Sequence, residues 1–351
     1  MKYTDFMDTY YLPPDNFTDY EFWGLQEFVS KESPSPLGLY IRDRKLVGLK
    51  VNCKLDATKR KAIAEMENLE LLDLGMLKGF SNPWMADLAK LPHLKLLILW
   101  YTSLNDAGIK KLSQSKSLEE LDIRSTKVRE AGIESLGELK SLRALKTSTP
   151  SSINFTCFES LSQLSHLKML DISRASNVYR SNYIDADSIH KMTEGLTALE
   201  YLNLDCIARG SETGFKFLKN LPNLKRLSLE SFVFDDESID TLQLFQQIEY
   251  LNLKWASIHT ISQANRLFQN LKVNHLNINY LLIQVFDEKP QLIKNIPNIY
   301  FQKRLVLESE RKLREVCKQF SPNFIDSEKD NSADNLDYFI RFDRWTEANI
   351  D

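Results

Sequence analysis

A repeat of about 24 residues limits the possible folds of this chain more than any other feature. The stretches LKLLILWYTSLNDAGIKKLSQSKS (94–117) and LEELDIRSTKVREAGIESLGELKS (118–141) superimpose residue by residue. Both have leucine at the first and fourth positions, threonine at the ninth and an AGI tripeptide further on. A unit this short cannot bury its apolar face alone, so the repetition predicts a solenoid in which each unit packs against its neighbours.

The same pattern recurs over most of the chain. Successive units begin 23 to 25 residues apart, except for one unit of 32 residues that starts at Leu167. We therefore expect about ten repeats of one architecture over residues 46–300. The predicted first positions are Leu46, Leu69, Leu94, Leu118, Leu142, Leu167, Leu199, Leu224, Ile248 and Val273.

The pattern resembles the leucine-rich repeat, L-x-x-L-x-L-x-x-N/C-x-L. This resemblance implies an α/β solenoid, a right-handed horseshoe with a parallel sheet on its concave face and short helices on its convex face. Apolar pairs at helical spacing, such as Ile109 with Leu112 and Ile239 with Leu242, are consistent with such helices. The consensus asparagine at the ninth position is replaced, which predicts a less regular horseshoe. The residues found there include Thr102, Thr126, Pro150, Ile207 and Phe232.

Segments outside the repeats are interpreted as caps and a tail. Residues 1–45 are rich in aromatic side chains, as expected of an N-terminal cap over an open solenoid end. Their last part, with the first repeat strand, predicts a β-hairpin around residues 42–45. Residues 301–321 read as a charged amphipathic C-terminal capping helix. Residues 322–351 read as a polar linker followed by a tail that could add an edge strand or bind a partner.

Composition excludes several classes of function. The chain has 45 Lys and Arg against 48 Asp and Glu, a net charge of −3, which argues against nucleic-acid binding. No apolar run approaches the length of a membrane span, and the first residues lack the apolar region of a secretory signal, so we expect a cytoplasmic protein. Four separated cysteines, with no CxxC pair, indicate reduced thiols.

The sequence contains no recognisable catalytic constellation. The five histidines are scattered, and there is no glycine-rich phosphate loop or HExxH motif. Cys317 is followed by about 34 residues, too few for the separate ligase domain that some repeat-containing bacterial effectors carry. We therefore expect no enzyme activity, no cofactor and no metal site.

Candidate binding residues follow from strand alternation. If the fourth and sixth positions face the core, the third, fifth and seventh face the opposite, concave side. Large or charged side chains there, together with the extra loop of the long unit, are the candidates for partner contact. Ordinary surface residues, loop drift and coverage by the N-terminal cap remain alternatives. The candidates are Trp100, Arg124, Tyr179, Arg180, Tyr183, Tyr201, Arg226, Tyr250 and Trp255.

Taken together, these features favour a non-catalytic scaffold for protein–protein recognition, with a folded partner held in the concave face. Two alternatives stay open. One is an inhibitor or immunity protein that blocks a partner enzyme, and the other is an effector or adaptor that recruits a second protein through its C-terminal tail.

Overall fold

The structure is a computed structural model of the 351-residue chain. It describes residues 37–42, 45–51, 54–150, 153–174, 183–209, 214–285, 298–301 and 323–326. The chain divides into two compact units at Ser148/Thr149, called unit 1 and unit 2 below. Each unit is described by itself.

Unit 1 begins with the expected hairpin. Strand β1 (Leu37–Arg42) pairs antiparallel with β2 (Lys45–Val51), which is also the first strand of the parallel sheet. Three-residue parallel strands then follow in chain order and in register. They are β3 (Leu71–Asp73), β4 (Leu96–Ile98), β5 (Glu120–Asp122) and β6 (Ala144–Lys146).

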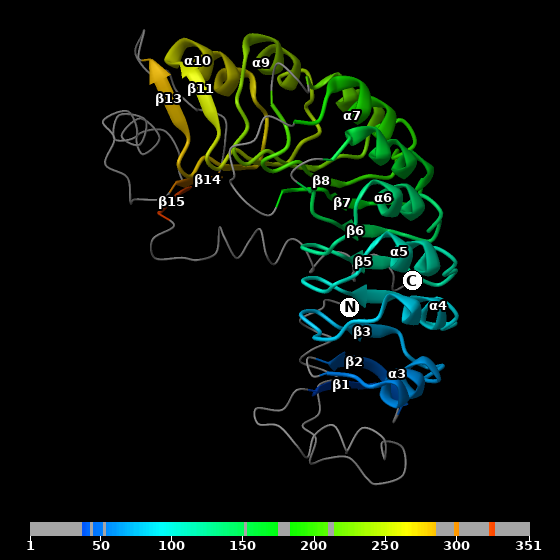
Figure 1. Cartoon of the computed structure of the whole chain (residues 1–351). Coiled ribbons are helices and arrows are strands. Elements are labelled where there is room, and N and C mark those ends of the chain that lie inside the picture. Colours follow the sequence, from blue (N-terminus) through cyan, green and yellow to red (C-terminus); the bar gives the residue numbers. More distant parts are fainter. Residues whose placement is uncertain are drawn as a thin grey trace. The chain divides into compact units, whose positions relative to one another are not determined.

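Unit 2 repeats this arrangement. Its parallel strands are β7 (Met169–Asp171), β8 (Tyr201–Asn203), β9 (Arg226–Ser228), β10 (Tyr250–Asn252) and β12 (His275–Asn277). Strands β11 (Ser257–Thr260) and β13 (Leu282–Val285) form a separate small parallel sheet. Figure 1 shows these strands succeeding one another along unit 2.

The sheet continues past the ten predicted repeats. Strand β14 (Asn298–Phe301) pairs with β12, and β15 (Asn323–Asp326) pairs with β14, both parallel. They begin 23 and 25 residues after the preceding strand, which is the spacing of the regular units. Strand β15 therefore lies inside the segment that the sequence predicted to be a polar linker.

Short helices follow the strands, where the apolar pairs predicted them. Unit 1 contains α3 (Ala57–Ala64), η2 (Asn82–Trp84), α4 (Met85–Leu88), α5 (Asp106–Leu112) and α6 (Glu130–Leu136). Unit 2 contains η3 (Phe155–Gln163), α7 (Ala186–Thr193), η4 (Lys216–Asn220), α9 (Asp236–Leu242) and α10 (Ile261–Asn270). In each unit the helices line the side opposite the strands (Figure 1).

Side-chain caps fix where several of these helices begin. The Asn105 side chain accepts a hydrogen bond from the Gly108 amide, and Asp235 accepts one from the Ser238 amide. Each bond satisfies an N–H group that has no partner within its helix. The apolar residues one turn later, such as Ile109 and Ile239, are fully buried. Capping and burial together explain helices this short.

The core lies between strands and helices, as the repeat pattern predicts. Fourth- and sixth-position leucines such as Leu97, Leu99 and Leu227 are completely buried. In unit 2 a cluster of phenylalanines adds to them, with Phe232 stacked on Phe215 at 5.2 Å and edge-on to Phe234 at 4.7 Å. Phe232 occupies the ninth position, where the repeats of unit 1 starting at Leu94 and Leu118 have threonine.

The ninth position thus replaces the missing asparagine in two ways. In unit 1 the Thr102 and Thr126 hydroxyls donate to the carbonyls of Leu99 and Ile123, each at 2.8 Å. Leu77 in unit 1 and Ile207 and Phe232 in unit 2 fill the core instead, and their amides donate to the carbonyls of Leu74, Leu204 and Leu229. In each of these repeats the sixth-position carbonyl therefore has a hydrogen-bond partner.

The glycine of the AGI tripeptide permits close packing between repeats. A Cβ atom on Gly132 would lie 2.6 Å from Asp106 Oδ1 and 2.6 Å from Val128 Cγ1. Asp106 Oδ1 also accepts a hydrogen bond from the Arg129 amide at 2.7 Å. Asp106 therefore cannot move away from an added Cβ atom without losing this hydrogen bond. The tripeptide is therefore a packing feature of the helical side.

Some predictions fall outside the described residues. The aromatic part of the N-terminal cap (1–36), the capping helix at 302–321 and the tail after residue 326 are among them. Within the described ranges, α10 with ten residues is the longest helix, and none is long and apolar enough to span a membrane.

Candidate functional site

A residue in the left-handed conformation recurs at the eighth position of the repeats. Its φ lies between 56° and 63° in every case. Bulky residues rarely adopt this conformation, because their Cβ atom crowds the backbone. The residues are Met76, Tyr101, Ser125, Cys206, Ser231, Trp255 and Tyr280.

Hydrogen bonds from the fifth position prepare this turn. The Asp73 carboxylate accepts the amide of Gly75, Asp122 that of Arg124, and Asn252 that of Lys254, at 2.9–3.1 Å. This is an Asx turn, in which a side chain binds the backbone two residues on. The buried Asp and Asn residues of the fifth position, which we expected to be displayed, therefore have a structural role.

The eighth position is tied to the next repeat through its backbone. The Met76 amide donates to the Trp100 carbonyl at 2.8 Å, and the Tyr101 amide donates to the Arg124 carbonyl at 2.9 Å. In unit 2 the Trp255 amide donates to the Asn279 carbonyl at 2.9 Å. These bonds hold eighth-position residues of successive repeats side by side.

Two repeats depart from this geometry. Thr149 and Arg174 hold the eighth position in the units starting at Leu142 and Leu167, and neither has a positive φ. Thr149 is β-branched and precedes Pro150, and both features disfavour a left-handed residue. In the repeat starting at Leu167 the Asx turn is nevertheless kept, because the Asp171 carboxylate accepts the Ser173 amide at 3.0 Å.

In unit 1 the turns expose a cluster of large apolar side chains. Met76 is 54% exposed, Tyr101 64% and Trp100 36%. The Trp100 and Tyr101 rings meet edge to face, with centroids 6.2 Å apart. The indole lies over Gly75, where an added Cβ would be 2.7 Å from its Cδ1 atom. Glycine at the seventh position thus leaves room for Trp100.

Basic side chains surround this cluster. Lys78, on the repeat of Met76, and Lys127, on the next repeat after Tyr101, are both exposed. Arg124 is partly exposed and binds the buried Asp122 carboxylate, with its Nη2 2.6 Å from Oδ2. We call Met76, Lys78, Trp100, Tyr101, Arg124 and Lys127 the unit 1 loop surface.

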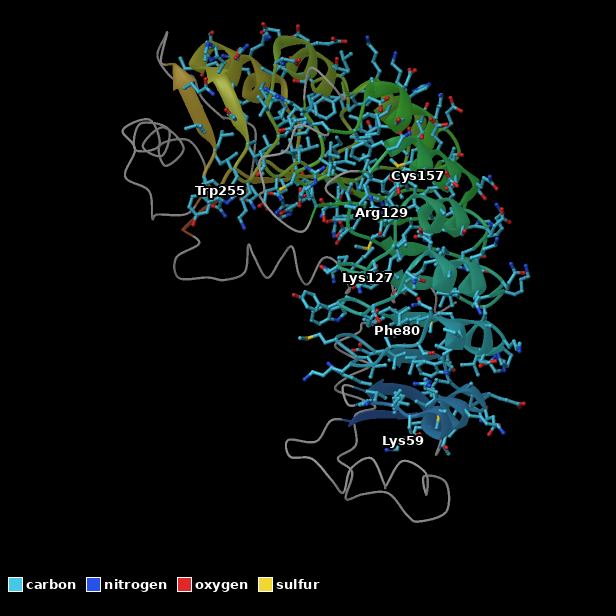
Figure 2. All side chains as sticks on the ribbon, viewed as in Figure 1. Lys59, Phe80, Lys127, Arg129, Cys157 and Trp255 are labelled. Carbon is cyan, nitrogen blue, oxygen red and sulfur yellow. The ribbon has the colours of Figure 1, made fainter. Side chains whose placement is uncertain are left out.

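Unit 2 exposes a second, smaller aromatic pair. The rings of Trp255 and Tyr280 are stacked almost parallel, 4.1 Å apart and inclined by 8°. Trp255 is 46% exposed, and Leu282, two residues after Tyr280, is 37% exposed. Figure 2 labels Trp255 near the strands β11 and β13 and away from the helices. We call Trp255 and Tyr280 the unit 2 aromatic pair, and Leu282 flanks it.

The predicted column of third-position residues is present in unit 2. Tyr201 pairs in register with Arg226, and Arg226 with Tyr250. The expectation that these tyrosines are displayed is not met, because Tyr201 is only 5% and Tyr250 only 3% exposed. The Tyr250 ring lies 6.5 Å from that of His275 on the neighbouring strand. Arg226 is partly exposed.

The extra loop of the long unit is only partly described. Tyr179 and Arg180 lie outside the described residues. Tyr183 is half-buried, and the Arg209 guanidinium lies 5.5 Å from its ring centroid. A neighbouring repeat therefore already occupies one face of this ring.

Sequence reasoning missed Met76, Tyr101 and Tyr280. Their common signal was visible, since all three stand one residue after the seventh position and align with Trp255. The sequence-based prediction assumes strand alternation up to the seventh position, whereas the strands end at the fifth position. The turn then directs the eighth side chain outward.

Two described titratable groups have strongly raised pKa values. Burial raises the pKa of Glu120 on β5 to about 7, although Lys146 opposes the shift, and burial raises the pKa of the Cys206 thiol, in the turn after β8, to about 11. A thiol with such a pKa is a poor nucleophile at neutral pH. Cys157 is buried, whereas Cys53 and Cys317 lie outside the described residues. The described side chains include no group of three His, Cys, Asp or Glu placed to hold a metal.

Solved structures with a similar fold come from several kingdoms. An internalin (InlF) of Listeria monocytogenes is 18% identical, with a TM-score of 0.40, over 80% of this chain and 87% of that one. A chain of the yeast Rad7–Elc1 complex is 18% identical, with a TM-score of 0.48, over 78% and 74%. The Arabidopsis receptor kinase HAESA, in complex with the peptide hormone IDA and SERK1, is 14% identical, with a TM-score of 0.46, over 84% and 52%. At these identities the similarity concerns the fold alone.

The family comparison covers most of the chain. No curated protein matches it. A family model described as "Leucine-rich repeat region" matches residues 45–314, which include every described strand of the sheet from β2 to β14. The chain therefore belongs to the leucine-rich repeat family.

Proposed function

We propose that this chain is a non-catalytic scaffold for protein recognition and that the loops after its strands make the contact. The proposal keeps Trp100, Arg124 and Trp255 from the residues that the sequence predicted, and it adds Met76, Tyr101 and Tyr280. It leaves out Tyr201 and Tyr250, because a side chain that is 95% buried offers a partner little surface.

The observation that carries the proposal is Tyr101, which is 64% exposed and held at a φ of 59°. The left-handed conformation costs a residue of this kind roughly 1–2 kcal/mol. An exposed ring recovers little of that cost by packing within the chain. Strained conformations of this kind cluster at functional sites, and tyrosine, tryptophan and arginine are the residues most often found at binding hot spots.

The same features in unit 2 support the proposal independently. Trp255 has a φ of 57° and Tyr280 a φ of 60°, and both rings are at least partly exposed. Monomeric proteins rarely expose contiguous apolar patches without a function. Each unit thus presents aromatic side chains at the same position of its repeats.

Affinity capture with matched variants tests this proposal. Lysate of the organism that encodes the chain is passed over the wild-type protein, Trp100→Ala/Tyr101→Ala, Trp255→Ala/Tyr280→Ala and Leu244→Ala. Leu244 is 71% exposed after α9 and serves as the control for loss of exposed apolar surface. Recovered proteins are quantified by mass spectrometry.

We expect at least one protein to be recovered about tenfold less by one of the double variants, as loss of a hot spot predicts. The Leu244→Ala variant should recover it like the wild type. Thermal melting confirms that all variants are folded. If all four proteins captured the same set in equal amounts, the exposed loops would not be the binding site.

A further inference from the structure

We infer that the partner segment recognised by the unit 1 loop surface is an acidic peptide that carries a large apolar side chain. This inference rests on the proposed function and specifies the chemistry of its partner. The reasons are the apolar centre of the surface, the basic sign of the charges at positions seven to twelve of its three repeats and the contrast with unit 2.

The centre of the surface fits an apolar side chain. Met76 and Tyr101 are neighbours across two repeats, because the Met76 amide binds the carbonyl of Trp100, the residue before Tyr101. Trp100 lies beside them over Gly75 and meets Tyr101 edge to face. Three large side chains from two adjacent turns therefore meet at one place, with Ser125 as the small eighth-position residue on the next repeat.

All charged side chains in these turns are basic. Positions seven to twelve of the three repeats read GMLKGF (75–80), WYTSLN (100–105) and RSTKVR (124–129). They contain Lys78, Arg124, Lys127 and Arg129 and no aspartate or glutamate. Since the whole chain has a net charge of −3, this basic character is local to the surface. A partner segment with negative charge would be attracted to it.

The two lysines carry most of this local charge. Arg124 is neutralised by Asp122 at 2.6 Å, and Arg129 lies 3.6 Å from Glu130. Among the described residues, Lys78 and Lys127 form no ion pair. They stand at the tenth position of the repeats before and after that of Tyr101, and thus flank the apolar centre.

This arrangement favours a peptide over a nucleic acid. Two lysines supply few phosphate contacts, whereas nucleic-acid binders generally present a basic stripe. Met76 offers no ring for base stacking, and an aliphatic or aromatic side chain of a peptide fits beside it. A single-stranded oligonucleotide is therefore included in the test as the competing ligand.

The test is a selection from a random peptide library on the full-length chain, followed by binding measurements. We expect the enriched peptides to share one large apolar residue flanked by Asp or Glu. The best peptide is labelled and its affinity measured by fluorescence anisotropy, beside a copy with Asn and Gln in place of its acids and a single-stranded oligothymidylate. Binding of the acidic peptide should weaken with increasing salt.

Charge reversal at two lysines provides the decisive variant. The Lys78→Glu/Lys127→Glu variant should bind the acidic peptide at least about tenfold more weakly, because two favourable contacts are lost and two repulsive ones are gained. The matched control, Lys110→Glu/Lys116→Glu, reverses two exposed lysines on α5 and in the turn after it, in the repeat between those of Lys78 and Lys127, and should bind like the wild type. Trp100→Ala/Tyr101→Ala should also lose the peptide.

Three results would overturn the inference: enrichment of neutral or basic peptides or of none, equal binding by the Lys78→Glu/Lys127→Glu variant, or tighter binding of the oligonucleotide. These outcomes differ from failure of the proposed function. If lysate capture depends on Trp100 and Tyr101 but is unaffected by reversal of the lysines, the scaffold proposal stands and the acidic partner is wrong.

Discussion

The turns of units 1 and 2 share one backbone and differ in their side chains. In both, the eighth residue is left-handed, except at Thr149 and Arg174 of unit 2, and its amide binds the next repeat. The turns of the unit 1 loop surface contain only basic charges, whereas the corresponding turns of unit 2 contain Asp205, Glu230 and Asp235 as well as Arg174, Arg209 and Lys254. The repeat therefore fixes how the chain turns, and the seventh to twelfth positions are left to vary in chemistry. Figure 2 labels Lys127 and Arg129 in unit 1 and Trp255 in unit 2.

Substitutions at the ninth position should show the largest difference between the units in their effect on the free energy of unfolding. Phe232→Ala removes a fully buried ring that contacts Phe215 and Phe234, and it should lower the free energy of unfolding by about 3–5 kcal/mol. Thr102→Val removes the hydroxyl that donates to the Leu99 carbonyl and accepts a longer bond from the Leu104 amide, and it should cost about 1 kcal/mol. Urea unfolding measures both. Equal losses would show that the two units are not stabilised in different ways at this position.

Variants at the fifth position separate the contribution of the Asx turn to stability from that of the ion pair. Asp122→Asn keeps the oxygen that accepts the Arg124 amide, as Asn252 does in unit 2 for Lys254, but it loses the charge that binds the guanidinium. We expect a loss of about 1 kcal/mol that shrinks at high salt. Asp122→Ala should cost more, because it also removes the Asx turn. If the two variants were equally stable by urea unfolding, the side-chain acceptor would not support the turn.

The strands of unit 1 should be more sensitive to pH than those of unit 2, whose third position carries no carboxylate from β7 to β12. Burial raises the pKa of Glu120 from 4.5 to about 7. The folded chain therefore holds this proton more tightly than the unfolded chain, and the stabilisation, complete below about pH 4.5, is lost as the pH rises through 7. Glu120→Gln should remove this decline in melting temperature between pH 5 and 8.

A matched control for this experiment is Glu134→Gln, which alters an exposed side chain on α6. It should retain the pH dependence of the wild type. An unchanged decline in Glu120→Gln would assign the effect to another group.

The smallest effect on stability is expected at the eighth position. Tyr101→Gly places the residue that tolerates a positive φ where the chain already has one, and the exposed ring contributes little burial. The two effects of glycine, relief of strain and greater freedom of the unfolded chain, oppose each other, so the melting temperature should change by no more than a few degrees. Peptide or partner binding should nevertheless fall. A strongly destabilised variant would mean that the tyrosine is present for the fold.

The sequence predicted those parts of the fold that depend on periodicity. The register of Tyr201 with Arg226 and Tyr250, the helices at Ile109 and Ile239 and the hairpin before Leu46 all follow from spacing and alternation. Strand β15 was harder to predict, because apolar positions are sparse around NFID, whereas Ile296, Ile299 and Phe301 keep the first, fourth and sixth positions apolar at β14.

The candidate site was less predictable, because it depends on backbone conformation. Nothing in the residue types of Tyr101 and Trp255 indicates a positive φ, which bulky side chains usually avoid. The burial of Tyr201 and Tyr250 likewise depends on the tertiary packing of the folded chain, which alternation does not report. Alignment of the repeats by position, extended past the end of the strand, would have grouped Met76, Tyr101, Trp255 and Tyr280.

Hydrogen–deuterium exchange of the full chain, with and without saturating selected peptide, tests the central claim most directly. The account predicts that the peptide protects amides within residues 75–80, 100–105 and 124–129 and leaves the helices α5 and α6 unchanged. Protection confined to residues 205–284, or spread over the helices, would contradict the assignment of the unit 1 loop surface as the binding site.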